Sequence, residues 1–128
     1  MKGGTELGRV RGLGSAKEGA GHWFTQRLTA FANVILILWL VLSLARLPGL
    51  DYDLVSEWMR SPLVAVPLML IVVNTFWHFK LGLTVVIEDY QHDHTRIVLL
   101  GLLNLFTFGM GALALFSILK VALGGTTA

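Results

Sequence analysis

Three long apolar stretches dominate the pattern of hydrophobic and polar positions along this chain. The first covers residues 28–45 without a charge, is bounded by an arginine at each end, and contains the run VILILWLVLSLA. Such a run is too continuous for an amphipathic surface helix. A bilayer core about 30 Å thick needs roughly 20 mostly apolar residues for one helical crossing. The first stretch therefore predicts a membrane-spanning helix over about residues 28–46.

The other two apolar stretches predict two further spans. The second is uncharged over residues 61–79 and stays largely apolar beyond them, which predicts a span over about residues 62–87. Pro67 lies in its first turns, where a missing N–H costs least, so the helix need not break there. The third stretch is uncharged over residues 97–119 and predicts a span of that extent.

Polar segments connect the spans. Residues 47–60 carry a Pro-Gly turn signal and three acidic side chains, and we expect a short interfacial helix around Trp58. Residues 88–96, EDYQHDHTR, form a short polar loop. The expected fold is all-α: an integral membrane protein whose three transmembrane helices pack in a bundle and form a single domain over residues 1–128.

The composition agrees with a membrane protein, because 55% of the 128 residues are hydrophobic, 14% are charged, and the mean hydropathy is +0.70. Three spans use most of this length, so no soluble catalytic domain fits within it. The formal net charge is +2, but the basic residues form no run with interleaved aromatic residues, so we expect no nucleic-acid partner. Without cysteine, any metal in this chain would need histidine or oxygen ligands.

The positions of Lys and Arg predict the orientation of the chain. Five of the ten precede the first span, whereas the first connector, counted with Arg46, has two and the C-terminal tail has one. Because basic flanks favour the cytoplasm, residues 1–26 are expected to form a cytoplasmic tail, with the loop 88–96 on the same side. A mitochondrial transit peptide is the alternative, but the segment is short, Gly-rich and contains Glu6 and Glu18.

His78 lies inside the second predicted span, where an ionisable side chain is costly enough to indicate a functional site. At 100° per residue it shares one helical face with Asn74, Gly82, Val85 and Asp89. A neutral imidazole is a usual axial ligand of a b-type haem, and Gly82 would leave space for a flat group against the helix. The alternative is an interhelical hydrogen bond in a packed bundle, and the periodicity leaves both open.

A haem held by two histidines would need a second ligand from another chain. The other three histidines, His22, His92 and His94, lie at or beyond the predicted membrane boundary. The propionates of a haem also need cations nearer the interface. Arg27, at the cytoplasmic start of the first span, is the candidate for this role.

Asp89 and Tyr90 close the second span at the cytoplasmic interface. A tyrosine in this position is often only an aromatic-belt anchor. Alternatively, the carbonyl oxygens of a quinone need hydrogen-bond donors, and a tyrosine hydroxyl beside a carboxylate can donate and relay protons. His92 and His94 could relay protons together with Asp89 and Tyr90, or they could simply be solvated side chains of an exposed loop.

Two segments carry a resemblance to a known family. The segment HFKLGLTVVIEDYQHDH, from His78 to His94, resembles the H-x11-Y signature of the small hydrophobic membrane anchor of succinate dehydrogenase (complex II). The segment GSAKEGAGHWFTQRLTA, residues 14–30, is similar to the sequence before the first span in alphaproteobacterial and mitochondrial-type members. The resemblance covers nearly the whole chain.

This resemblance implies a four-subunit succinate dehydrogenase assembly. In it the bundle packs against a second membrane-anchor chain, which we call the partner anchor, and docks an iron–sulfur subunit and a flavoprotein subunit. It implies that His78 is an axial ligand of a haem b shared with the partner anchor. By the same resemblance Asp89 and Tyr90 border ubiquinone, and Arg27 lies near a haem propionate or the quinone. A bacterial cytoplasmic membrane is the expected location, with the mitochondrial inner membrane as the alternative.

The chain contains no flavin, succinate-binding or iron–sulfur motif, so we expect no activity from it alone. Two other functions stay open. One is the anchor of a related fumarate reductase, which runs the same chemistry in reverse. The other is a structural membrane adaptor without a cofactor.

Overall fold

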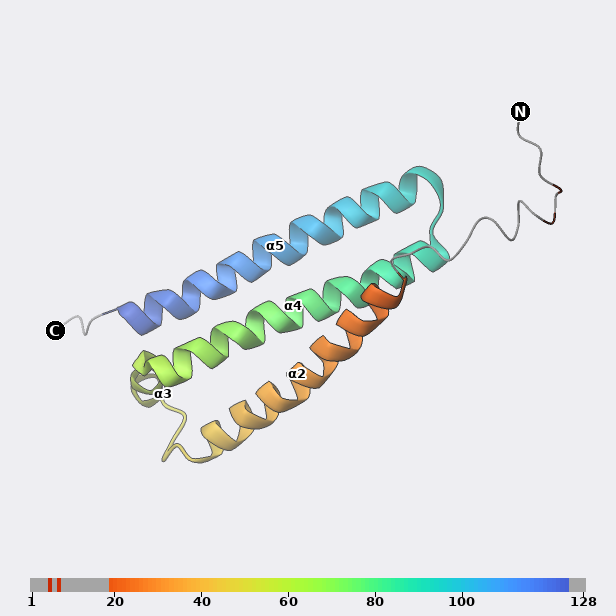
Figure 1. Ribbon diagram of the computed structural model, residues 1–128. Coiled ribbons are helices and arrows are strands. Elements are labelled where there is room, and N and C mark those ends of the chain that lie inside the picture. The colour runs from red at the N-terminus through yellow and green to blue at the C-terminus, as the bar shows by residue number, and fades with distance from the viewer. Residues whose placement is uncertain (1–4, 6, 8–18, 125–128) are drawn as a thin grey trace.

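The computed structural model describes Thr5, Leu7 and residues 19–124, and this part of the chain forms helices without a strand (Figure 1). The all-α prediction is therefore confirmed. Of the tail expected over residues 1–26, most lies outside the described residues. The helices are α2 (Gly19–Ala45), α3 (Tyr52–Arg60), α4 (Pro62–Tyr90) and α5 (Asp93–Leu123).

Three of these helices, α2, α4 and α5, are long and apolar enough to cross a membrane. They extend beyond the apolar stretches: α2 begins at Gly19, and only Gln91 and His92 separate α4 from α5. Polar residues continue these helices because the backbone hydrogen bonds do not depend on the apolar side chains. Asp93, the first residue of α5, has a φ of 54°, a left-handed conformation that aspartate tolerates better than most residues.

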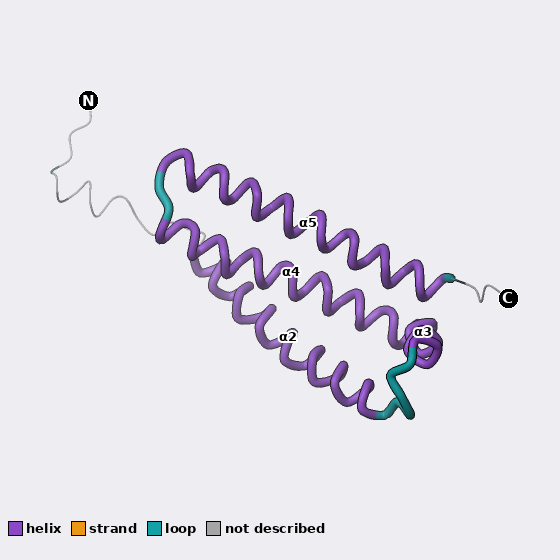
Figure 2. Tube along the Cα trace, turned by 180° about the vertical axis from the view of Figure 1, so that it is seen from behind, coloured by secondary structure: helices purple, strands orange, loops and turns teal. Residues whose placement is uncertain are grey.

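Helix α4 lies between the other two spans (Figures 1 and 2). It packs against α2 on one side and α5 on the other, and in the described residues the α2 and α5 backbones do not come close to each other. The start of α2 and the α4–α5 turn lie at one end of the molecule, whereas α3 and the end of α5 lie at the other. The bundle is therefore an open row of helices.

Aromatic and small residues form the α4–α5 contact. The Phe106 ring lies 6.4 Å from that of Phe76 and 6.1 Å from that of Phe79, measured between ring centroids. A methyl group on Gly111 would lie 3.9 Å from the Phe76 ring, so the two helices approach closely there. Aromatic pairs at these separations add to the energy of apolar burial.

The short helix expected around Trp58 is confirmed as α3, and its place at the membrane interface stays a prediction. Its Trp58 stacks on Trp39 of α2, with 6.4 Å between ring centroids and 19° between ring planes. The Trp58 Nε1–H also donates a hydrogen bond of 3.2 Å to Ser43 Oγ. These contacts tie α3 to the end of α2, while its remaining packing is against α4 and α5.

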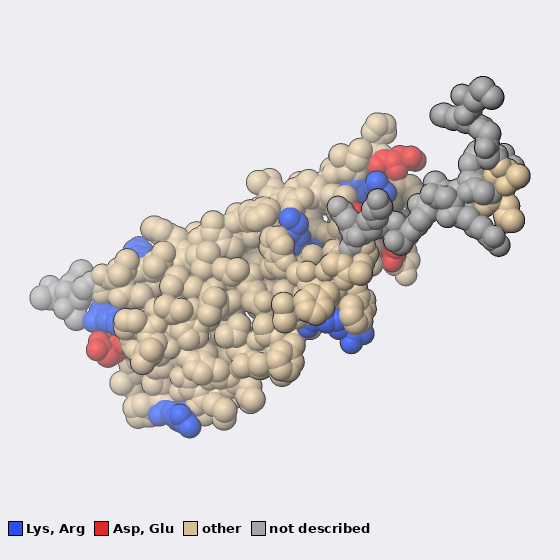
Figure 3. Space-filling view, in the orientation of Figure 1, with Lys and Arg blue, Asp and Glu red and all other residues tan. Residues whose placement is uncertain are grey.

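Very few side chains are buried within this chain. In the described part, only five residues are buried: Val64, Ala65, Ile87, Leu103 and Thr107. Many large apolar side chains of the long helices are exposed, and Figure 3 shows Asp and Glu only towards the two ends of one face, with mostly uncharged residues between them. Such an outer surface suits lipid or partner helices, because in water it would far exceed the apolar patches of soluble monomers.

Candidate functional site

His78 bonds to the neighbouring helix α2. Its Nδ1 lies 2.9 Å from Oγ1 of Thr29, and the side chain is half-buried. Within the described residues the Nε2 nitrogen has no hydrogen-bond partner. The prediction of an interhelical hydrogen bond is thus confirmed. It does not compete with a ligand role, because a histidine that uses one ring nitrogen in a hydrogen bond can bind a metal through the other.

A second group of polar contacts lies one turn along α4. The Asn74 amide Nδ2 donates 2.8 Å hydrogen bonds to the Thr29 backbone oxygen and to Asn33 Oδ1. The Thr75 hydroxyl donates a 3.1 Å hydrogen bond to the same Asn33 oxygen. Together with the His78 bond, these contacts form a polar ladder between α2 and α4, made of Thr29, Asn33, Asn74, Thr75 and His78.

Gly82 allows the two helices to approach rather than keeping an open face. A methyl group on Gly82 would lie 3.3 Å from Nε2 of Gln26 on α2. The expectation that this glycine leaves room for a flat group is therefore wrong for the space directly over Gly82, which the Gln26 side chain takes. The cause is the crossing of α2 over α4, and a helical periodicity cannot reveal which neighbour lies over a face.

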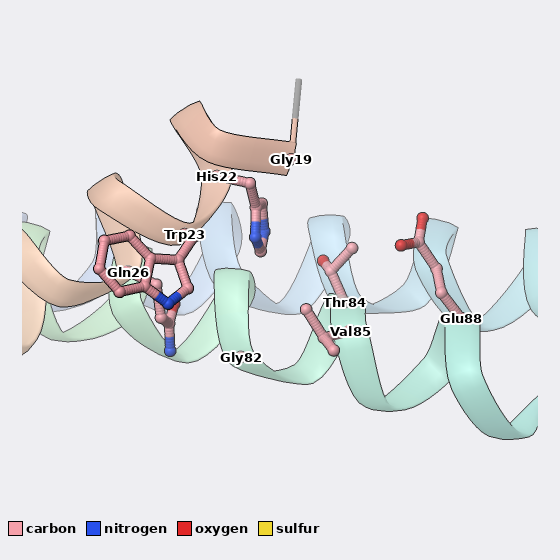
Figure 4. Close-up of a pocket in the computed structure, with 8 residues that line it drawn as sticks. All are labelled: Gly19, His22, Trp23, Gln26, Gly82, Thr84, Val85 and Glu88. Carbon is pink, nitrogen blue, oxygen red and sulfur yellow. The ribbon is translucent and has the colours of Figure 1, made fainter. Parts of the chain in front are cut away.

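A hollow of about 630 Å³ opens beside Gly82, between the start of α2 and the end of α4. Figure 4 shows the α2 side chains on one side of it and the α4 side chains on the other. Gln26 Oε1 is buried and has no hydrogen-bond partner in the described part of the chain. An unsatisfied buried oxygen costs about 1 to 3 kcal/mol. The hollow is lined by Gly19, His22, Trp23, Gln26, Gly82, Thr84, Val85 and Glu88.

Asp89 and Tyr90 lie apart from His78. Both end α4 and are exposed, Tyr90 by 77%. Twelve residues of helix separate Tyr90 from His78, which is about 18 Å along the axis at 1.5 Å per residue. Tyr90 thus lies at the end of α4, whereas His78 lies well inside the helix. His92 and His94 lie beyond the interface, along an exposed hollow at the start of α5.

Arg27 is exposed on α2 and stacks on Trp23, with its guanidinium carbon 5.1 Å from the ring centroid. Trp23 itself lines the hollow beside Gly82, so this arginine lies next to that hollow without pointing between α2 and α4. In the part of the chain that the structure describes, no carboxylate forms an ion pair with Arg27, which lies near the end of α2 predicted to be cytoplasmic.

The sequence model of the succinate dehydrogenase/fumarate reductase transmembrane subunit matches residues 1–111, most of the chain. The chain belongs to this family. It is 31% identical over 115 residues to the succinate dehydrogenase hydrophobic membrane anchor subunit of Rickettsia bellii (strain RML369-C), covering 87% of this chain and 92% of the relative. The protein of the same name from Rickettsia conorii (strain ATCC VR-613 / Malish 7) is 32% identical over 116 residues, again covering 87% and 92%.

A more distant relative in this family carries the same name. The hydrophobic membrane anchor subunit from Paracoccus denitrificans is 28% identical over 115 residues, which cover 90% of this chain and 89% of the relative. No solved structure matches the chain significantly. The predicted resemblance to succinate dehydrogenase membrane anchors is confirmed by these comparisons.

The residues of this succinate dehydrogenase/fumarate reductase transmembrane chain fit a haem better than an independent metal site. No group of three or more His, Asp or Glu in the described residues lies close enough to hold a metal ion. A haem iron shared with a second chain would need only one ligand from this chain, and no hydrogen bond in the described residues uses His78 Nε2. The adjoining hollow has a mostly apolar lining.

Reasoning from the sequence missed the α2 half of this site. Gln26, Thr29 and Asn33 are three and four residues apart, so they lie on one face of a helix. This spacing in the sequence could have indicated a polar face on α2. His22, expected beyond the membrane boundary, lines the hollow as well.

Proposed function

We propose that this chain is the membrane anchor of a succinate:ubiquinone oxidoreductase, which holds one side of a haem b and contributes to the ubiquinone reduction site. Its relatives are named succinate dehydrogenase membrane anchor subunits, which supports succinate rather than fumarate as the substrate of the complex. The observation that carries the haem role is the mid-span His78, bonded through Nδ1 and free at Nε2.

The haem role assigns three tasks to this chain and its partner anchor. His78 Nε2 would hold the iron, and a histidine of the partner anchor would supply the second ligand. Arg27 lies toward the interface, where propionates need cations. Haem bound there would accept and return single electrons.

The ubiquinone role belongs to the exposed end of α4. Tyr90 presents its hydroxyl outward, and no hydrogen bond in the described residues uses it. In the proposed site the Tyr90 O–H donates to a quinone carbonyl oxygen, and the neighbouring Asp89 carboxylate passes protons from water as the quinone is reduced. Both side chains then face the iron–sulfur subunit, from which the electrons arrive.

The proposed assembly places the chain in a bacterial cytoplasmic membrane with its N-terminus in the cytoplasm. The start of α2 and the α4–α5 turn share one end of the molecule. With the basic flank inside, Asp89 and Tyr90 face the cytoplasm, where the iron–sulfur and flavoprotein subunits dock. The exposed apolar faces on both sides of the helix row suit the partner anchor and lipid.

The absorption spectrum of the purified complex tests the haem role. His78→Ala should lose or alter the α-band of a reduced b-type haem, while the helix still inserts, because removing an imidazole from a span favours insertion. His94→Ala, at an exposed position outside the span, is the matched control and should leave the band unchanged. An unchanged band in His78→Ala would move the ligand role to another residue. A wild-type complex without haem would favour the structural adaptor.

A further inference from the structure

The Thr29 hydroxyl group, which contacts His78, also lies within hydrogen-bond distance of two backbone carbonyl oxygens. Its Oγ1 lies 2.9 Å from the Thr25 backbone oxygen and 3.1 Å from the Gln26 backbone oxygen. The same oxygen lies 2.9 Å from His78 Nδ1. Carbonyl oxygens only accept hydrogen bonds, and a hydroxyl carries one proton for three neighbours.

The direction of the bond to His78 follows from this count. If the hydroxyl donated to Nδ1, its lone pairs would face two carbonyl oxygens at 2.9 and 3.1 Å with no proton between them. If it donates to the carbonyl oxygens instead, which can share its one proton in a three-centre hydrogen bond, a lone pair is left for a proton on Nδ1, and this arrangement leaves fewer oxygens facing each other without a proton. The second arrangement makes Nδ1–H the donor, so the lone pair of the neutral ring lies on Nε2.

We propose that Thr29 is a positioning residue, which holds His78 in the Nδ1–H tautomer and aims its Nε2 lone pair away from α2 toward the haem iron. This inference rests on the proposed function, since it specifies how His78 is prepared as a ligand. A hydrogen bond from the second nitrogen of a ligating histidine fixes the ring orientation and raises the basicity of the ligand.

The polar ladder holds Thr29 in place for this role. Asn74, one turn from His78 on α4, donates to the backbone oxygen of Thr29 at 2.8 Å. Helix α4 therefore contacts Thr29 at two points one turn apart, through its backbone oxygen and its hydroxyl. The Asn74 contact uses no side-chain atom of Thr29, so it survives a change of that side chain.

Thr29→Val tests the inference in the purified complex, because it removes the hydroxyl and keeps the branched shape. We expect haem binding to weaken by about 10- to 100-fold, as is typical when the partner of a metal-bound histidine is removed. The haem midpoint potential should rise, since a less basic ligand stabilises the ferric form less. A tenfold loss confined to the ferric form corresponds to about 59 mV.

Two variants control this measurement. Thr29→Ser keeps the hydroxyl and should restore the wild-type potential and ferric electron paramagnetic resonance spectrum. Thr25→Val removes a hydroxyl one turn away that bonds only to the Gly21 backbone oxygen, and should change neither. If the Thr29→Val complex does not assemble, Thr29→Ala is the second variant. It removes the same hydroxyl and introduces no larger side chain, so the same shift is expected.

The outcomes separate this inference from the proposed function. If His78→Ala loses the haem band but both Thr29→Val and Thr29→Ala keep the wild-type potential and spectrum, the positioning role is wrong and the ligand role stands. If His78→Ala keeps the band, both are wrong. A Thr29→Val shift that Thr29→Ser does not reverse would indicate a packing effect and would also overturn the inference.

Discussion

The two tyrosines of the chain have similar exposure but lie at opposite ends of the molecule. Tyr90 is 77% exposed at the end of α4, and Tyr52 is 81% exposed at the start of α3. Either ring can act as an interfacial anchor, so exposure alone does not distinguish an anchor from a ligand-binding residue. The hydroxyl group does distinguish the two roles. A ring that only anchors the chain at the interface hardly needs a hydroxyl, whereas a residue that donates a hydrogen bond to a carbonyl oxygen depends on it.

Tyr90→Phe should slow quinone reduction while leaving the soluble subunits unaffected. Losing one donor to a quinone oxygen costs on the order of 1 to 3 kcal/mol, which is roughly 5- to 150-fold in rate or affinity. Succinate oxidation with an artificial acceptor that takes electrons before the membrane subunits should stay nearly unchanged. The two assays on the purified complex, with Tyr52→Phe as the matched control, measure this contrast. If the Tyr90→Phe complex reduces ubiquinone at the wild-type rate, the proposed role of Tyr90 in quinone binding is wrong.

At the scale of the elements, the pairing of α2 with α4 differs from that of α4 with α5. The α4–α5 contact is aromatic, through Phe76, Phe79 and Phe106. The α2–α4 contact is polar, through the ladder of Asn33, Asn74 and their neighbours. In lipid, apolar side chains gain little from moving between lipid and another helix, so hydrogen bonds and close packing decide which helices pair.

Asn74→Leu should weaken the α2–α4 pair, because it removes two hydrogen bonds across that contact. Measured couplings of this kind average about 0.6 kcal/mol and reach about 1.7 kcal/mol. A double-mutant cycle with Asn33→Leu, followed by unfolding of the purified complex in SDS, measures the coupling. Asn104→Leu is the control, because Asn104 is also half-buried but bonds only to Leu100 of its own helix. Equal stability of Asn74→Leu and wild type would show that the ladder does not hold the pair together.

The whole molecule is a row of three spans with two chemically different ends. One end carries the start of α2, the end of α4 and the α4–α5 turn, and with them the hollow, Asp89 and Tyr90. The other end carries α3 and its acidic connector. All groups assigned to cofactor or quinone therefore lie in the half of the molecule nearer to the first end, where a docking partner would meet them together.

Reporter fusions at residues 92 and 55 should place these ends on opposite sides of the membrane. Residue 92, between α4 and α5, is expected in the cytoplasm with the basic N-terminal flank, and residue 55, in α3, outside. Fusions at residue 120, near the end of α5, should report the same side as residue 55, because α5 is expected to cross the membrane between residues 92 and 120. Residue 92 outside together with residue 55 inside would reverse the orientation and remove Tyr90 from the reach of a cytoplasmic iron–sulfur subunit.

The number of spans and the family could be predicted from the sequence. Hydrophobicity adds up along the chain and the bilayer sets the length of a span, so three uncharged stretches predict three helices without knowledge of their neighbours. The cost of an ionisable side chain in lipid likewise marks His78 from sequence alone. The segment from His78 to His94 and the segment 14–30 then together carry the resemblance to the family.

Only the tertiary structure decided what surrounds these residues. The rotation of α2 against α4 depends on packing between segments far apart in the chain, and it places Thr29 beside His78 and Gln26 over Gly82. The same packing leaves α2 and α5 apart in the described residues, with α4 between them. A helical period defines the face on which a residue lies, but the neighbour on that face is set by how the helices cross.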